Sequence, residues 1–324
     1  MHTSTSCIKA IFLTFICLFG CTSIAQNYPT QAIKIVVGFS PGGVPDIAAR
    51  VIGQHMSENW KQPVVVENKL GAGSNIAAQF VANAPSDGYT LLSVSSAFAI
   101  SPSIYSSMAF DPIKDFSGVT LTATGPALVL ISTNLKINTI KELMEYAAKN
   151  PGKVTYSSAG IGSGSHFAAE LMQAKAGVEF LHIPTKGIPD GITEVISGRV
   201  DFFISPYASA INLVKTGKVR AIAITSTKRF KDLPNLPTVS ESGIPGYKWE
   251  FWYGLLAPAK TPKPILQKIA LEVKRILDLQ SVKERFDELG TTAVSSTPEQ
   301  FDKLIASEIT EFARLAKLSG IKPE

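Results

Sequence analysis

The chain has 324 residues, of which 45% are hydrophobic and 18% charged, with a formal net charge of +5. This is the balance of a globular protein long enough for two well-buried domains, and it excludes a disordered or fibrous chain. Basic residues form no long run and do not alternate with aromatic side chains, so we expect no nucleic-acid partner.

Residues 1–25 have the three-part layout of a secretory signal peptide. One lysine and no acid precede the apolar run IFLTFICLFG, and Ser23 and Ala25 supply the small residues of a cleavage site. A run of about ten apolar residues is too short to span a bilayer. We therefore predict an exported, periplasmic protein that is cleaved after Ala25. The alternative is a lipid anchor on Cys21, because LFGC resembles a bacterial lipobox.

Cysteines and histidines limit the chemistry of the mature chain. Cys7, Cys17 and Cys21 all lie in the leader, so the mature chain has no disulfide, thiolate zinc site or cysteine nucleophile. The remaining histidines, at 55, 166 and 182, have no metal-ligand spacing. We expect neither a metal nor a cofactor.

Strand and helix patterns alternate along the mature chain. The helix after the first strand has Asp46 as its expected N-cap, and Thr139 and Glu142 have the spacing of a capping box. Helical periodicity also marks 264–277 and 301–318. Repeated β-α units predict an α/β fold with mainly parallel sheets. The predicted strands are 33–39, 64–68, 90–96, 154–159, 179–184, 200–205 and 219–225.

Three loops that follow predicted strands are small, polar and glycine-rich: SPGGVPD (40–46), SVSSAFAIS (93–101) and SAGIGSGSH (158–166). In parallel sheets such loops line the binding crevice, and a helix start in one of them offers unpaired N–H groups to an anion. The dinucleotide pattern GxGxxG and the phosphate-loop pattern GxxxxGK[ST] are both absent. The loops therefore indicate a small bound anion rather than a nucleotide.

Individual histidines have plain structural interpretations beside the functional ones. His166 lies at a helix start, where ligand contact or capping is favoured over general-base catalysis. His182 is expected to be a hydrogen-bonded core histidine, and His55 a packing or surface residue. An exported hydrolase would depend on His166 beside Ser163 and Ser165.

Seven segments together resemble the Bug (TctC) proteins, the extracytoplasmic solute receptors of tripartite tricarboxylate transporters. They are SPGGVPDIAARVIGQHMSE, VVVENKLGAGSNIAA, PSDGYTLL, TYSSAGIGSGSHFAAEL, HIPTKG, LPTVSESGIPGY and GLLAPAKTPK. The resemblance implies a periplasmic-binding-protein-like α/β fold without enzymatic activity, in which two lobes hold the ligand between them. Lobe 1 would comprise 26–127 and 249–324, and lobe 2 would comprise 128–248, with crossings near 127–132 and 251–258.

The resemblance also implies a site in which backbone amides of two loops hold a ligand carboxylate above a third segment. The residues that this predicts as ligand-binding are Phe39, Ser40, Gly42, Gly43, Val44, Pro45, Asp46, Ser95, Ser96, Ala97, Ala159, Gly160, Ser163, Ser165, His166, Thr185, Ser205 and Tyr207.

Departures from the family pattern bear on the ligand. Val44 and Pro45 stand where many members read PGGGTD, and Thr185 replaces a tyrosine. Ser205 and Pro206 stand where members often have Asp-Asn, so an ammonium group would lack a partner. We therefore predict a di- or monocarboxylate without an amine, aromatic acids included. We expect a monomer whose partners are the membrane subunits of a tripartite tricarboxylate-type transporter. The alternative is a ligand sensor for a two-component system.

Overall fold

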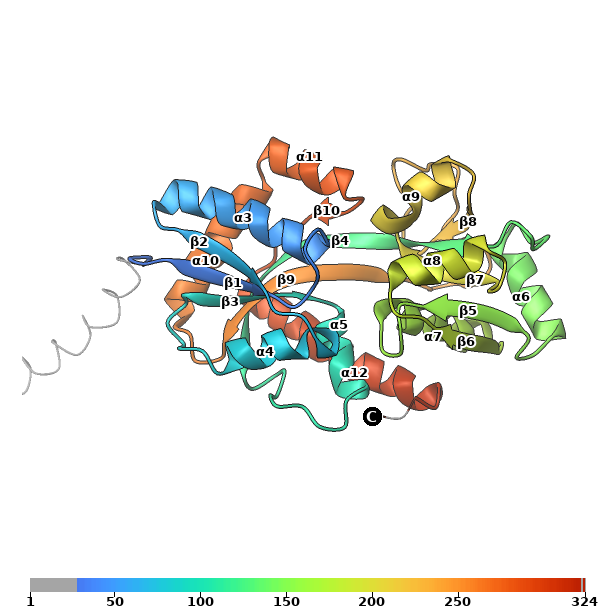
Figure 1. Cartoon of the computed structure of the whole chain (residues 1–324), viewed down its shortest axis with the longest axis horizontal. Coiled ribbons are helices and arrows are strands. Elements are labelled where there is room, and N and C mark those ends of the chain that lie inside the picture. Colours follow the sequence, from blue (N-terminus) through green and yellow to red (C-terminus); the bar gives the residue numbers. More distant parts are fainter. Residues whose placement is uncertain (1–27, 322, 324) are drawn as a thin grey trace, which may run out of the picture.

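The computed structural model describes residues 28–321 and 323 (Figure 1). The predicted signal peptide and the alternative anchor at Cys21 lie outside these residues. Within the described range, no helix is long and apolar enough to cross a bilayer.

The first group of strands is a parallel arrangement in the order β2–β1–β3. Alternate residues of β1 serve two separate cores: Ile33, Ile35 and Val37 pack beneath helix α3, whereas Val36 packs with helix α4 on the opposite face. A strand covered on both faces in this way needs a continuous apolar run, which is the pattern of IKIVV. The elements are β1 (Ile33–Val37), α3 (Val44–Trp60), β2 (Val64–Asn68), the 3₁₀ turn Ala72–Ser74, α4 (Asn75–Ala82), β3 (Thr90–Ser95), α5 (Ala97–Ile100) and the 3₁₀ turn Ser101–Ser103.

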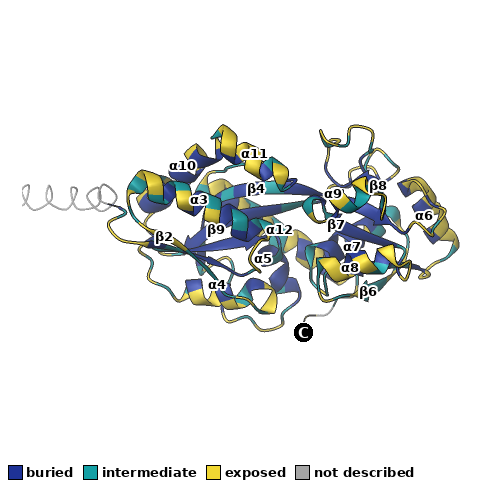
Figure 2. Cartoon of the chain, turned by 45° about the horizontal axis from the view of Figure 1, so that its top comes forward, coloured by how far each residue is buried: buried dark blue, intermediate teal, exposed yellow. Residues whose placement is uncertain are grey.

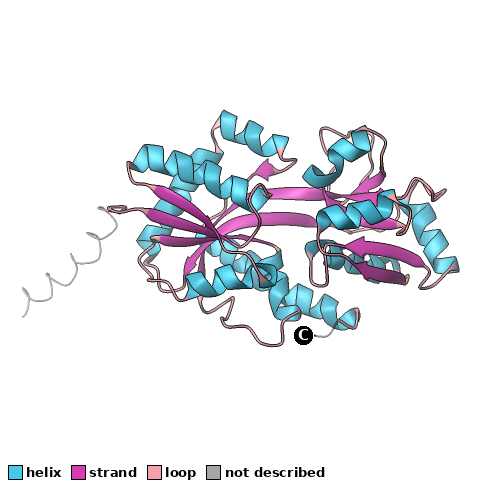
Figure 3. Ribbon diagram, in the orientation of Figure 1, coloured by secondary structure: helices cyan, strands magenta, loops and turns pink. Residues whose placement is uncertain are grey.

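Two long strands connect this group to the rest of the molecule (Figure 3). Strand β9 (Glu250–Pro258) lies between β3 and β4 and is antiparallel to both. Strand β4 (Phe116–Ile131) pairs with β9 from Phe116 to Pro126. It then pairs with β7 (Phe202–Pro206) from Ala127 and with β8 (Arg220–Ile224) from Leu128, in both cases to Ile131. The hydrogen-bonding partners of β4 therefore change at Pro126 and Ala127, and both long strands are largely buried (Figure 2).

The second group of strands contains β7–β5–β6, paired in parallel, and β8, which pairs with β4. Helices separate these strands along the chain, as the alternating pattern predicted. The elements are α6 (Ile140–Lys149), β5 (Val154–Ser158), α7 (Gly164–Ala176), β6 (Phe180–Pro184), α8 (Ile188–Ile196), β7 (Phe202–Pro206), α9 (Tyr207–Lys215) and β8 (Arg220–Ile224).

The carboxyl-terminal helices return to the first group, but the last one also reaches the second. Helix α12 begins at a capping box formed by Thr297 and Gln300 and packs against β4, α5 and α7. The ring of Phe312 lies 5.6 Å from the rings of both Phe167 and Trp249. The elements are α10 (Lys263–Leu277), α11 (Gln280–Glu288), β10 (Thr292–Ala293) and α12 (Pro298–Leu318).

The α/β architecture predicted from the sequence is confirmed, but the sheet is mixed rather than mainly parallel, because every pairing of β4 and of β9 is antiparallel. Local corrections also apply. The N-cap of α3 is Gly43 rather than Asp46, because Pro45 occupies the first turn, where its missing N–H costs nothing. Thr139 accepts the N–H of Glu142, as predicted, but the Glu142 carboxylate takes the N–H of Asn138 instead of that of Thr139. The capping box at this helix is therefore only half formed.

Candidate functional site

The loop 39–46 is held from inside by the Asp46 carboxylate. This carboxylate accepts the N–H of Gly42 at 2.9 Å, the Nε–H of Arg50 at 3.0 Å and the Nδ2–H of Asn68 at 2.8 Å. The amide of Asn68 also donates to the carbonyl oxygen of Phe39 at 3.0 Å. The carboxyl end of β2 therefore fixes the loop that follows β1.

Asp46 is 2% exposed, and the loop geometry depends on its charge. Burial by itself would raise the pKa of this carboxyl, but the hydrogen bonds from Arg50, Gly42 and Asn68 outweigh burial and lower it. The carboxylate is therefore ionised at neutral pH. Its hydrogen bonds with Gly42, Arg50 and Asn68 give Asp46 a structural part in the loop.

Several N–H groups of the first loop are already paired within the protein. Gly43 donates to the carbonyl of Ser40, Asp46 donates to the carbonyl of Gly43, and Pro45 has no N–H. Within the described residues, the N–H groups of Phe39, Ser40 and Val44 have no partner, and Val44 is the first residue of α3. This helix start therefore offers one amide close to the loop.

Strand β3 continues the site beside the first loop. The hydroxyl of Ser93 donates to the carbonyl of Pro45 at 3.1 Å, which ties the start of α3 to β3. Ser95 accepts the N–H of Ala97 at 3.4 Å, and the N–H of Ser96 donates to Trp252 of β9. The serines at the end of β3 thus lie next to both the first loop and the long strand β9.

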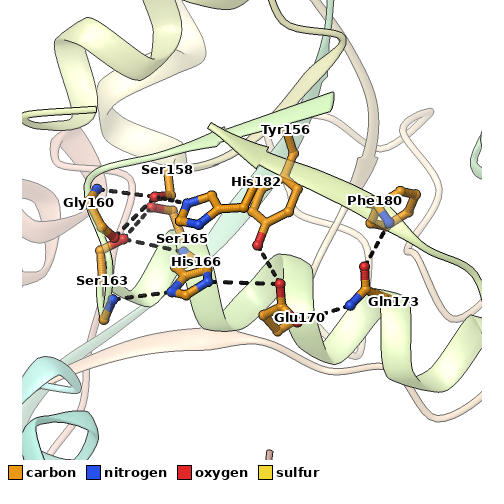
Figure 4. Close-up of polar contacts among 11 residues, drawn as sticks. Tyr156, Ser158, Gly160, Ser163, Ser165, His166, Glu170, Gln173, Phe180 and His182 are labelled. Atoms are coloured by element: carbon orange, nitrogen blue, oxygen red, sulfur yellow. Dashed lines mark hydrogen bonds and ion pairs between the residues drawn. The ribbon is translucent and has the colours of Figure 1, made fainter. Parts of the chain in front are cut away.

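The second loop, 159–166, is folded around its own side chains (Figure 4). Ser158 Oγ accepts the N–H of Gly160 at 3.1 Å, and Ser165 Oγ accepts that of Ala159 at 2.9 Å. Ser163 caps α7 by accepting the N–H of His166, and His166 Nδ1 accepts the N–H of Gly162 at 3.2 Å. Each side-chain acceptor therefore removes one backbone donor from the loop surface.

Three N–H groups of the second loop have no partner within the described residues: those of Ile161, Gly164 and Ser165. Gly164 and Ser165 are the first two residues of α7, where the helix dipole adds positive potential. Such a helix start suits a carboxylate or another small oxyanion. Ile161 and Gly164 were missed by the sequence analysis, because only the folded loop distinguishes free amides from paired ones.

The second loop lies against the segment that follows β3. A Cβ placed on Gly162 would come within 2.6 Å of Ile104, and one placed on Gly164 would come within 2.4 Å of Phe251. The start of α3 and the loop after β5 both lie at the boundary between the two groups of strands (Figure 1). The first loop, the end of β3 and the second loop thus form a connected series of contacts.

Thr185, Ser205 and Tyr207 direct their hydroxyl groups to protein partners. Thr185 Oγ1 donates to the carbonyl of Ser158 at 2.6 Å, and the fully buried Ser205 donates to the carbonyl of Pro206 at 3.2 Å. The hydroxyl of Tyr207 donates to Asp232 at 3.2 Å. Their contact with a ligand stays a prediction.

The arrangement of serine and histidine is not that of a hydrolase. The ring of His166 accepts from a backbone amide, and Ser163 contacts the backbone N–H of His166 rather than its imidazole. His182 does lie 2.6 Å from Ser158 Oγ, as expected of a hydrogen-bonded histidine, but that serine is fully buried. No group of three potential metal ligands occurs among residues 28–321 and 323.

Comparison with known proteins gives a consistent result. Protein BugT of Bordetella pertussis is 31% identical over 300 residues, which cover 92% of each chain. A Rhodopseudomonas palustris protein solved with adipate, Rpa4515, is 32% identical with a TM-score of 0.81, covering 92% of this chain and 100% of its own. MatC of the same organism, solved with bound malate, is 31% identical with a TM-score of 0.75, covering 89% and 99%.

These likenesses define the protein as a solute-binding receptor with a periplasmic-binding-protein-like α/β fold, and not as an enzyme. The profile of the tripartite tricarboxylate transporter family receptors, TctC, matches residues 48–321. The chain therefore belongs to the TctC family, which confirms the resemblance seen in its sequence.

Proposed function

We propose that the protein is a periplasmic receptor that captures a small carboxylic acid without an amine and delivers it to the membrane subunits of a tripartite tricarboxylate-type transporter. The observation that carries this proposal is the start of α7, where the N–H groups of Ile161, Gly164 and Ser165 are unpaired. A carboxylate there would accept charge-assisted hydrogen bonds, each contributing about 1.5–3 kcal/mol. The free N–H of Val44 would contact the ligand from the first loop.

The two loops belong to different parts of the chain, which suggests how binding is signalled. We assign 26–127 and 249–324 to one lobe and 128–248 to the other, joined by β4 and β9. A ligand that contacts both loops stabilises the closed arrangement by its differential affinity for that arrangement. The closed form would be the one that docks on the membrane subunits.

The ligand class follows from the groups that surround the two loops. No acidic side chain ends β7, because Ser205 occupies that position with its hydroxyl turned to Pro206. An amino acid would then bury an ammonium group without a partner, which is costly. Adipate and malate, the ligands of the two similar receptors, are both dicarboxylates without an amine and are the first candidates.

A thermal-shift screen tests the proposal on the protein recovered after export. The panel contains adipate, malate, aromatic acids, aspartate, glutamate and phosphate. A ligand at about 100 times its dissociation constant adds about 2.7 kcal/mol of stability, which raises the melting temperature by roughly 5 °C. Response to a carboxylate without an amine supports the receptor. Response to aspartate or glutamate alone contradicts the ligand class, and silence from every carboxylate contradicts the carboxylate site.

A pair of variants tests the start of α7 directly. Ser165→Pro removes one free N–H at a helix position that accepts proline, and it also removes the hydroxyl that holds Ala159. Ser165→Ala removes only the hydroxyl and is the matched control. We expect Ser165→Pro to bind the ligand roughly tenfold to a hundredfold more weakly than Ser165→Ala. Equal affinities would contradict binding at this amide.

A further inference from the structure

Beneath the second loop, two histidines stack face to face. The ring centroids of His166, on α7, and His182, on β6, lie 4.0 Å apart, with ring planes inclined by 10°. Tyr156 of β5 extends the stack, with its ring 4.7 Å from that of His182 (Figure 4). His166 is 4% exposed, so its imidazole is closed off from solvent.

Each imidazole has a hydrogen-bonding task in the second loop. His166 Nδ1 accepts the N–H of Gly162, so its proton must be on Nε2, which lies 3.8 Å from Glu170 Oε1. His182 Nε2 lies 2.6 Å from Ser158 Oγ, and the same hydroxyl contacts both the N–H and the carbonyl of Gly160. His166 thus holds Gly162 directly, and His182 holds Gly160 through Ser158.

The ionisable groups around the two rings have hydrogen-bond or ion-pair partners of their own. On α7, Glu170 accepts a hydrogen bond from the Tyr156 hydroxyl at 2.5 Å and another from Gln173 at 3.0 Å. Strand β7, also packed on α7, carries no ionisable residue before Tyr207, whose hydroxyl bonds Asp232. On α12, Glu308 pairs with Trp252, and Glu311 pairs with Arg314.

Burial dominates the ionisation of both rings. It lowers the pKa of His166 to about 3, with a further contribution from His182, and it lowers the pKa of His182 to about 4. Both histidines are therefore neutral at physiological pH. If Nδ1 of His166 were protonated, it could no longer accept the N–H of Gly162, because both groups would be donors.

We propose that His166 is a positioning residue rather than a ligand contact, and that its neutral Nδ1 holds Gly162 so that the neighbouring free amides face the ligand. His182 supports Gly160 in the same way through Ser158. Gly162 has a φ of +76°, which favours glycine, and lies against Ile104, so the turn that presents its N–H to His166 depends on a glycine at this position. The expected effect on ligand affinity rests on the proposed function. The expected effect on the hydrogen bond of Gly162 rests on the loop geometry alone.

Side-chain replacements separate the two nitrogens of His166. In His166→Asn the Oδ1 atom stands near the place of Nδ1 and cannot be protonated, so the bond to Gly162 is kept. His166→Gln places its oxygen nearer to Nε2, and His166→Leu supplies no acceptor at all. His55→Leu is the matched control, because His55 lies on α3, where its Nδ1 is 3.5 Å from Glu58.

The experiment measures amide hydrogen exchange at Gly162 by NMR and adipate affinity by calorimetry, on the exported protein and each variant. We expect slow exchange and full affinity in the wild type, His166→Asn and His55→Leu. In His166→Leu and His166→Gln we expect fast exchange at Gly162 and affinity lower by roughly tenfold to a hundredfold. The imidazole nitrogen shifts should show the Nε2–H tautomer of His166.

Distinct outcomes overturn the inference and the proposed function. If His166→Leu folds and keeps wild-type affinity and slow exchange at Gly162, or if His166→Asn does not restore them, His166 does not position the loop. If His166→Leu fails to fold, the contrast between the Asn and Gln variants decides. If the wild type binds neither adipate nor any other carboxylate, the proposed function fails, and exchange at Gly162 still decides the role of His166.

Discussion

Replacing Gly162 by alanine tests the contact between the second loop and the segment after β3. The φ of +76° costs an alanine about 1–2 kcal/mol, because its Cβ crowds the backbone in the left-handed region. Its Cβ would also lie 2.6 Å from Ile104, and such overpacking costs about 1–3 kcal/mol more. We therefore expect Gly162→Ala to reduce the free energy of unfolding by about 2–5 kcal/mol.

Two further variants divide this cost into its parts. Gly152→Ala has a similar φ of +68° but no atom within 4 Å of the new Cβ, so it should lose only the conformational term. Ile104→Ala should cost about 2–5 kcal/mol by itself, because Ile104 is buried. In the double variant the missing side chain leaves room for the new Cβ, so its stability should exceed the additive sum by about 1–3 kcal/mol.

Urea denaturation measures the free energies of unfolding of the four proteins and the wild type. Additivity of Gly162→Ala and Ile104→Ala within about 0.5 kcal/mol would refute the contact, because independent sites add to that accuracy. Equal losses of unfolding free energy in Gly162→Ala and Gly152→Ala would also refute the contact with Ile104.

Three more predictions concern other parts of the molecule. Asp46→Asn should destabilise the protein by about 1–3 kcal/mol at pH 7. Because hydrogen bonds outweigh burial and lower the pKa of Asp46, the difference between variant and wild type should shrink as the pH falls below about 4. Urea midpoints measured across pH would show this. Burial raises the pKa of Glu308 to about 7, so wild-type stability should fall as the pH rises from about 5 to 8. Glu308→Gln should flatten this dependence of stability on pH. An unchanged pH dependence in the variant would contradict a raised pKa for Glu308. Phe312→Ala should cost about 3–5 kcal/mol by opening a cavity between Phe167 and Trp249, and a loss below about 1 kcal/mol in calorimetric unfolding would contradict that packing.

Strands with continuous apolar runs were predictable because burial on both faces leaves a simple sequence pattern. The strand expected at 33–39 is found as β1 (Ile33–Val37), in which every residue but Lys34 is buried. The strand expected at 64–68 is confirmed as β2 (Val64–Asn68), although it lies at the sheet edge and is only partly buried. The first part of β4 was missed, because Gly118, Gly125 and Pro126 interrupt the apolar run there. Those residues are tolerated where β9 and the carboxyl-terminal segment pack closely against the strand, and such long-range contacts leave no local signal.

The candidate site was predictable as a set of loops but not as a set of donors. A glycine-rich loop before a helix predicts free amides, yet the amides of Gly160 and Gly162 are taken by Ser158 and His166. Those pairings depend on side chains that fold back onto the loop, and the second ring, His182, comes from a different strand. Asn68, which fixes the first loop, carried only the weak signal of a polar residue at a strand end.

The position of β9 between β3 and β4 has a consequence for the order in which the chain can fold. While the chain is being synthesised, β3 and the first part of β4 are present long before Glu250–Pro258 emerges, and neither can yet pair with β9. Until then β3 exposes an unpaired edge, the kind of surface that promotes aggregation. The first group of strands is therefore completed only after the second group has been made, and the edge of β3 stays open until β9, near the start of the last quarter of the chain, has been synthesised.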